Sequence, residues 1–74
     1  MKEGKLYYDG SVGRYDVRYP DGGEYGGLHC GEVIGIKMDG VWKSARLEYS
    51  AGWYLFDFDL SPEEVALSGY PVRI

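Results

Sequence analysis

The fold is decided by residues 33–56, which read VIGIKMDGVWKSARLEYSAGWYLF. Apolar and polar side chains alternate through much of this stretch, and Asp39-Gly40 is a preferred sequence for a two-residue hairpin turn. The stretch therefore predicts an antiparallel hairpin with one buried face. The pairs across its turn are Met38 with Val41, Ile36 with Lys43, Ile34 with Ala45 and Glu32 with Leu47.

A second two-residue turn is predicted at Ala51-Gly52, so that three consecutive strands form a meander. The two turns share the middle strand, and both place apolar residues on the same face of it. The second turn pairs Tyr49 with Tyr54, Leu47 with Phe56 and Ala45 with Phe58. The predicted core face consists of Cys30, Ile34, Ile36, Met38, Val41, Ala45, Leu47, Tyr49, Tyr54, Phe56 and Phe58.

The opposite face of the meander is mixed, with too much apolar area for a simple solvent face. Five of its residues form the candidate binding face: Trp42, Arg46, Glu48, Trp53 and Asp57. One interpretation is a recognition groove in which the two tryptophans are flat anchors and the charges orient a ligand. The other is structural: Arg46 braces the two carboxylates, and the tryptophans pack under an N-terminal hairpin.

The flanking segments complete the predicted fold, which is a single all-β domain over residues 1–74. Strands at 5–8 and 14–19 are expected to form a further hairpin. The segment 19–27 is rich in residues that favour turns, and it is expected to be a loop. Ser61-Pro62-Glu63-Glu64 predicts a helix start, with serine as the N-cap and a capping box. Residues 70–74 are expected to return as a last edge strand. We expect a small five-stranded SH3-like barrel with one short helical turn before the last strand. An open meander with a terminal helix is the alternative.

Composition limits the classes of function that the chain can serve. It has 74 residues, a net charge of −4, one cysteine and one histidine. This excludes an internal disulfide and leaves too few ligands for a structural zinc site. No apolar run approaches the roughly 20 residues that span a bilayer. We therefore expect a cytoplasmic protein without a membrane association, and the acidic balance disfavours binding to nucleic acid.

The residues that could carry chemistry are better explained as structural. His29 and Cys30 are neighbours in a predicted strand, so their side chains point to opposite faces and the imidazole cannot readily activate the thiol. A metal site using His29 with Glu32 or Glu48 is the minor alternative. The Asp57/Asp59 and Glu63/Glu64 pairs are interpreted as solvated charges. The sequence predicts no catalytic, cofactor-binding or metal-binding residue, and hence no enzyme.

Several motifs resemble a small bacterial family of unknown function that occurs mainly in Firmicutes. They are Leu28-His29-Cys30-Gly31-Glu32, Trp42 with Arg46-Leu47-Glu48-Tyr49, Trp53-Tyr54-Leu55, Gly4-Lys5-Leu6, Gly13-Arg14-Tyr15 and Val72-Arg73-Ile74. The resemblance covers nearly the whole chain. It implies a short stand-alone protein encoded near mobile elements, and it brings no catalytic residue or ligand.

The leading functional hypothesis is a non-enzymatic module that binds a protein or peptide through an aromatic face or a strand edge. The alternative is a nucleic-acid-related role, either direct binding or acidic mimicry of DNA. A third possibility is a homo-oligomer in which edge strands pair. The sequence does not determine the oligomeric state or the partner.

Overall fold

The computed structural model describes residues 2–56 and 68–74, which form one antiparallel sheet and no helix. Six strands make the sheet, in the order β2-β1-β6-β3-β4-β5. Their bounds are β1 Glu3–Asp9, β2 Arg14–Arg18, β3 Val33–Met38, β4 Val41–Tyr49, β5 Trp53–Leu55 and β6 Pro71–Arg73.

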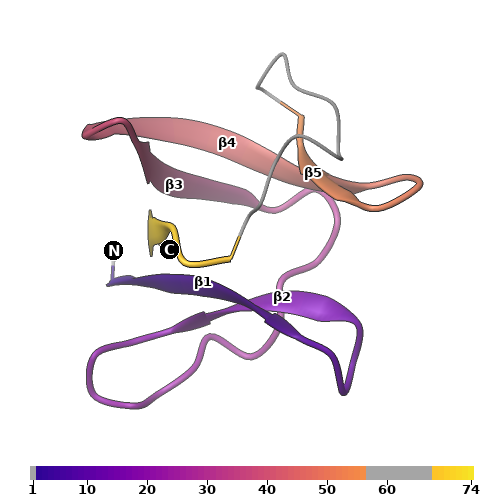
Figure 1. The fold of residues 1–74 in the computed structure, drawn as a ribbon, viewed down its shortest axis with the longest axis horizontal. Helices are drawn as coiled ribbons and strands as arrows, with labels where there is room; N and C mark the ends of the chain where they lie inside the picture. The colour runs from indigo at the N-terminus through magenta and orange to yellow at the C-terminus, as the bar shows by residue number, and fades with distance from the viewer. Residues whose placement is uncertain (1, 57–67) are drawn as a thin grey trace.

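The sheet curls so that its two halves face each other across a common core. In Figure 1, β1 and β2 lie below, β3, β4 and β5 lie above, and β6 lies between the two halves. The core residues come from both halves: Leu6, Val17, Tyr19, Leu28, Ile34, Ile36, Ala45, Leu47, Leu55 and Val72. Each half alone would expose one apolar face, and their joint burial supplies the main driving force for folding.

The Asp39-Gly40 hairpin forms with the predicted register. Met38 lies opposite Val41 and Ile34 opposite Ala45. Both turn residues have positive φ angles, 52° at Asp39 and 77° at Gly40, as a type I′ hairpin turn requires. Aspartate and glycine tolerate that conformation better than other residues, so the local sequence fixes this turn.

The second turn differs from the prediction by one residue. Tyr49 pairs with Trp53 and Leu47 with Leu55, so the loop has three residues, 50–52. A two-residue turn would place Ala51 in the left-handed region, which alanine disfavours. The longer loop avoids this conformation, and it reverses the faces of every residue in β5.

The register change corrects the predicted core face. Leu55 is buried with 1% of its surface exposed, whereas Phe56 is 54% exposed. Tyr54 pairs with Glu48 on the outer face, and Phe58 lies outside the described residues. Cys30, Val41 and Tyr49 were also predicted to face the core and are exposed. Val41 and Tyr49 occupy the two ends of β4.

The predicted five-stranded barrel is replaced by an open sheet. The outer edge of β2 is occupied by the loop that follows it, because Tyr25 N–H donates to the Val17 carbonyl and Leu28 N–H to that of Tyr15. Since β2 has these partners, it is not hydrogen-bonded to β5, and the sheet does not close. The predicted helical turn at 61–64 lies outside the described residues.

The last strand was predicted at an edge but lies in the middle of the sheet. β6 pairs with β1 on one side and β3 on the other, with Val72 opposite both Gly4 and Ile36. Lys2 and Ile74 exchange backbone hydrogen bonds at 3.0 and 3.1 Å, which extends the pairing to the end of the chain. Pro71, which has no N–H group, is the first residue of the strand. The two halves of the sheet are thus joined by the C-terminal residues.

Candidate functional site

Three of the five candidate residues share the outer face of β4. Trp42, Arg46 and Glu48 alternate with the buried Ala45 and Leu47, as the strand pleat requires. Arg46 Nε lies 2.8 Å from Glu48 Oε2, and both side chains are partly exposed. The structural interpretation, in which Arg46 braces Glu48, is therefore compatible with the geometry. Asp57 lies outside the described residues.

Trp53 is on the other side of the sheet, because the second turn differs from the predicted one. Its indole N–H donates to the carbonyl of Gly13 at 3.2 Å. The ring also makes edge-to-face contacts with Tyr15, at 6.4 Å between ring centres, and with Tyr49, at 5.1 Å. Trp53 thus connects the two ends of the sheet and does not share a face with Trp42.

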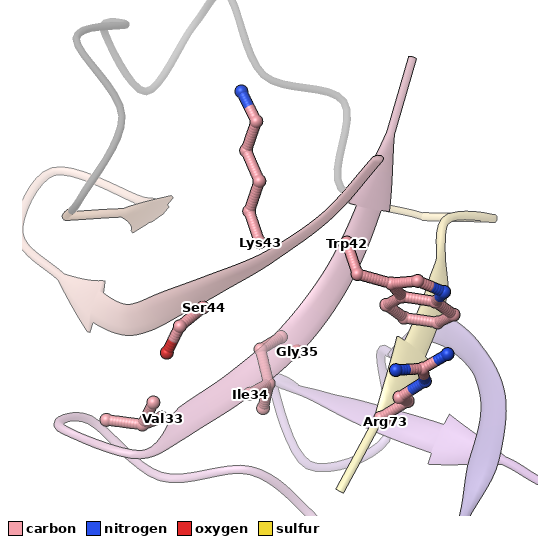
Figure 2. Close-up of a pocket in the computed structure, with 7 residues that line it drawn as sticks. All are labelled: Val33, Ile34, Gly35, Trp42, Lys43, Ser44 and Arg73. Atoms are coloured by element: carbon pink, nitrogen blue, oxygen red, sulfur yellow. The ribbon is translucent and has the colours of Figure 1, made fainter. Parts of the chain in front are cut away.

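The outer face carries a groove of about 230 Å³ around Trp42. Its lining comes from three adjacent strands and consists of Val33, Ile34, Gly35, Trp42, Lys43, Ser44 and Arg73. Figure 2 shows the Trp42 indole lying over the Arg73 guanidinium, while the Lys43 side chain points away from both. The groove therefore has an aromatic wall with a cation stacked against it.

Gly35 lies beside this stacked pair. Gly35 pairs with Arg73 across β3 and β6, and with Ser44 across β3 and β4. A side chain at position 35 would begin 3.4 Å from Arg73 Cβ and 3.9 Å from Trp42 Cε3. Beside this position, the guanidinium carbon of Arg73 lies 3.8 Å from the centre of the Trp42 ring. This is a cation–π contact at close range.

Sequence reasoning found Trp42 but not its two partners. Gly35 and Arg73 come together only because β6 inserts between β1 and β3, and that pairing joins segments far apart in the chain. The signals available were an isolated glycine inside a strand pattern, which is typical of close approach by another group, and an arginine in the last strand.

The outer face of β1 and β2 holds a second polar cluster that sequence reasoning missed. Asp16 is buried and its Oδ1 accepts hydrogen bonds from the N–H groups of Val17, at 2.7 Å, and Gly26, at 3.0 Å. The Tyr7 hydroxyl contacts both Asp16 and Glu24. Asp16 thereby holds the loop after β2 against the strand, and every contact supports a structural role.

The His29-Cys30 pair lies in the connection between β2 and β3, and both side chains are exposed. His29 Nδ1 lies 3.2 Å from Glu32 Oε1. The same carboxylate accepts a hydrogen bond from Tyr25, and this bond together with the negative charge raises the pKa of Tyr25 above its ordinary value of 10.0. Within residues 2–56 and 68–74, no three His, Cys, Asp or Glu side chains are placed to hold a metal ion.

The fold and the groove define a small all-β domain with an open antiparallel sheet and a surface site on its outer face. The sequence of residues 4–74 matches the domain of unknown function DUF5348, and the chain belongs to that family. The expected membership of a family of unknown function is thus confirmed. Its occurrence mainly in Firmicutes and its specific motif pattern stay predictions.

The structure is similar to the crystal structure of a protein from Ruminococcus gnavus, solved by a structural genomics consortium. The two chains are 42% identical, with a TM-score of 0.85, and the match covers 99% of this chain and 100% of the other. No curated protein sequence matches this chain significantly. In the described part of the chain, no helix has the length and apolar character needed to cross a bilayer.

Proposed function

We propose that this chain is a non-enzymatic interaction module that binds a protein or peptide through the groove around Trp42. The observation that carries the proposal is the half-buried indole of Trp42, which stacks on Arg73 at the side of an open groove. Tryptophan and arginine are among the side chains most enriched where binding energy concentrates at protein interfaces. Here they are adjacent and reachable from solvent.

The groove rests on a rigid support. Its lining residues come from β3, β4 and β6, which are neighbouring strands in the middle of the sheet and are joined by continuous backbone pairing. Strand-borne sites hold their geometry better than loop-borne sites, which lowers the entropy lost when a ligand binds. Arg46 and Glu48 lie on the same face of β4 and would border a bound segment.

Site-specific photo-crosslinking tests this proposal. A photoreactive benzoylphenylalanine replaces Ser44, an exposed residue of the groove, and in a matched control it replaces Tyr49, which is exposed on the other side of β4. We expect position 44 to capture a specific partner in the native host, position 49 not to capture it, and Trp42→Ala to abolish capture without unfolding the domain. Identical capture at both positions, or a Trp42→Ala variant that changes stability alone, would contradict the proposal. A crosslinked dimer would indicate a homo-oligomer instead.

A nucleic-acid-related role is the second candidate, and one observation favours it. Lys5, Arg18 and Lys37 are exposed on the same face of the sheet as the groove, although the chain as a whole is acidic. A salt titration with single- and double-stranded oligonucleotides tests direct binding. When a protein contacts phosphates, the logarithm of the binding constant falls linearly with the logarithm of the salt concentration. Absence of binding at low salt would remove it.

A further inference from the structure

The charge on the described part of the sheet is unevenly distributed. Four basic side chains occupy the middle of the outer face, from β2 across to β3: Arg18, Lys5, Arg73 and Lys37. Two acidic side chains of the described residues lie among them: Glu3 is opposite Arg73, and Glu24 is bridged to Arg18 and accepts a hydrogen bond from the Tyr7 hydroxyl. Farther out, Glu48 is paired with Arg46, and Asp16 is buried in its own hydrogen bonds. The centre of the outer face is thus positive on a protein whose net charge is −4.

Arg73 is the basic residue best placed to recognise an anion. Its guanidinium is stacked on the Trp42 ring, and this stacking leaves the N–H groups of the fork directed outward in the guanidinium plane. The acidic group near it in the described structure is Glu3, with its Oε1 3.8 Å from Arg73 Nε and both side chains partly exposed. A separation of that length is an ion pair without a good hydrogen bond. A carboxylate entering the groove could accept two hydrogen bonds from the fork.

The aromatic rings of the same face are poorly arranged for stacking nucleobases. The Arg73 guanidinium covers one face of Trp42 at 3.8 Å, and the Arg18 guanidinium lies 4.4 Å from the centre of the Tyr7 ring. Proteins that bind single-stranded nucleic acid use open aromatic faces along a basic groove. Here a guanidinium occupies one face of each ring, and a base that stacked on that face would have to displace it. A ligand that approaches the guanidinium edge needs no such displacement.

The groove also has an apolar component. Trp42 and Val33 contribute apolar surface beside the Gly35 backbone, and its volume of about 230 Å³ suits one or two side chains of an extended segment. A ligand that places a carboxylate against Arg73 and an adjacent aliphatic side chain against Trp42 would satisfy both parts. The surrounding lysines and Arg18 would attract further negative charge over longer range.

Building on the proposed function, we infer that the partner of this groove is an acidic peptide segment in which carboxylate and aliphatic side chains lie close together. The Arg73 fork binds a carboxylate, the Trp42 ring packs on the aliphatic neighbour, and the basic side chains of the outer face add electrostatic attraction.

An NMR titration of the ¹⁵N-labelled full chain tests this inference with defined probes. The first probe is a blocked heptapeptide in which glutamate and leucine alternate. The second has glutamine in place of glutamate, and the third is an oligothymidylate of similar length. The indole N–H of Trp42 and the amide of Gly35 report on the groove. The indole N–H of Trp53, which is hydrogen-bonded to Gly13, is an internal control.

We expect the glutamate peptide to shift the signals of Trp42 and Gly35 saturably, to leave Trp53 unchanged, and to bind more weakly as salt is added. The glutamine peptide should bind about tenfold more weakly. Arg73→Lys keeps the charge but removes the planar fork, so we expect it to weaken binding several-fold. Arg18→Lys, which also keeps its charge but lies outside the groove, should have little effect.

Equal affinity for the two peptides, tighter binding of the oligothymidylate, or no shift with millimolar glutamate peptide would each overturn the inference. These failures are distinct from a failure of the proposed function. A partner that is captured at position 44 but is insensitive to Arg73→Lys would leave the interaction module in place and remove the acidic partner.

Discussion

Trp42 and Trp53 occupy similar positions in the sequence but opposite environments in the molecule. Each lies within two residues of a turn in the β3-β4-β5 meander, and each is half-buried. Trp42 stacks on Arg73 at an open groove of the outer face. Trp53 turns to the other side of the sheet, where it hydrogen-bonds to Gly13 near the start of β2. One ring is available to a ligand, whereas the other holds two parts of the fold together.

The difference arises in the two turns. The Asp39-Gly40 turn has two residues and places Trp42 outward, whereas the 50–52 loop has three residues and places Trp53 inward. One extra loop residue is sufficient, because side chains alternate strictly along a strand. The comparison teaches that the face of an aromatic residue in a short meander depends on turn chemistry more than on the residue itself.

The largest expected effect tests the register of β5 directly. Leu55→Ala removes a side chain that is 1% exposed, and we expect it to lower the free energy of unfolding by about 3 kcal/mol. Phe56→Ala removes a larger side chain that is 54% exposed and contacts the Arg46 guanidinium, so we expect a loss of less than about 1 kcal/mol. Urea denaturation of both variants measures the difference. A larger destabilisation by Phe56→Ala than by Leu55→Ala would contradict the observed register and support the two-residue turn at Ala51-Gly52.

The next largest effect is the difference in stability lost when each tryptophan is replaced by alanine. Trp53→Ala loses the hydrogen bond to Gly13 and the contacts with two tyrosine rings, and we expect a destabilisation of about 2 kcal/mol. Trp42→Ala loses the stacking on Arg73 at a partly exposed site, and we expect about 1 kcal/mol. Thermal denaturation measures both.

A phenylalanine at position 53 is the matched control for this pair. The Trp53→Phe variant keeps a smaller aromatic ring and lacks the indole N–H, so it should recover part of the stability that Trp53→Ala loses. Equal destabilisation by Trp42→Ala and Trp53→Ala would show that both rings are structural, and it would remove the main support for a binding role of Trp42.

The sequence was sufficient for the parts of this fold that local chemistry decides. The β3-β4 hairpin follows from Asp39 and Gly40, and the first hairpin from the glycine-rich turn between β1 and β2. The outward face of Trp42, Arg46 and Glu48 follows from the same register. The three-residue loop was missed because Ala51-Gly52 was interpreted as a two-residue hairpin turn, whereas Gly52 does not adopt the left-handed conformation that such a turn uses.

The groove could not be predicted from the sequence, because it is a product of long-range pairing. Arg73 reaches Trp42 only after β6 has inserted between β1 and β3, and no local propensity specifies which strands flank a short C-terminal segment. The burial of Leu28 was missed for the same reason. Leu28 follows two glycines in an irregular segment, and it is buried because its N–H pairs with the Tyr15 carbonyl along the edge of β2.

A smaller effect on stability is expected from filling the floor of the groove. Gly35→Ala places a methyl group at the edge of ordinary contact with Arg73 and lowers the backbone entropy of the unfolded chain. We therefore expect the free energy of unfolding to change by no more than about 0.5 kcal/mol. The same methyl group should weaken the ligand shift of the Trp42 indole signal, because it occupies the space beside the stacked pair. A large destabilisation would mean that Gly35 serves the fold and not the groove.

The smallest effect concerns the connection between β2 and β3, which contains neither tryptophan. The Glu32 carboxylate accepts a hydrogen bond from Tyr25, and its charge opposes ionisation, so the pKa of Tyr25 is raised above 10.0. A pKa that is raised on folding stabilises the protein at pH values below the unfolded pKa, and this contribution is lost as pH rises through the folded pKa. Glu32→Gln should lower the pKa of Tyr25, as measured by its ring ¹³C shift, whereas Glu24→Gln should not. If Glu32→Gln also moved the indole signals of Trp42 and Trp53, the connection would be coupled to both faces, and the separation between the binding ring and the structural ring would not hold.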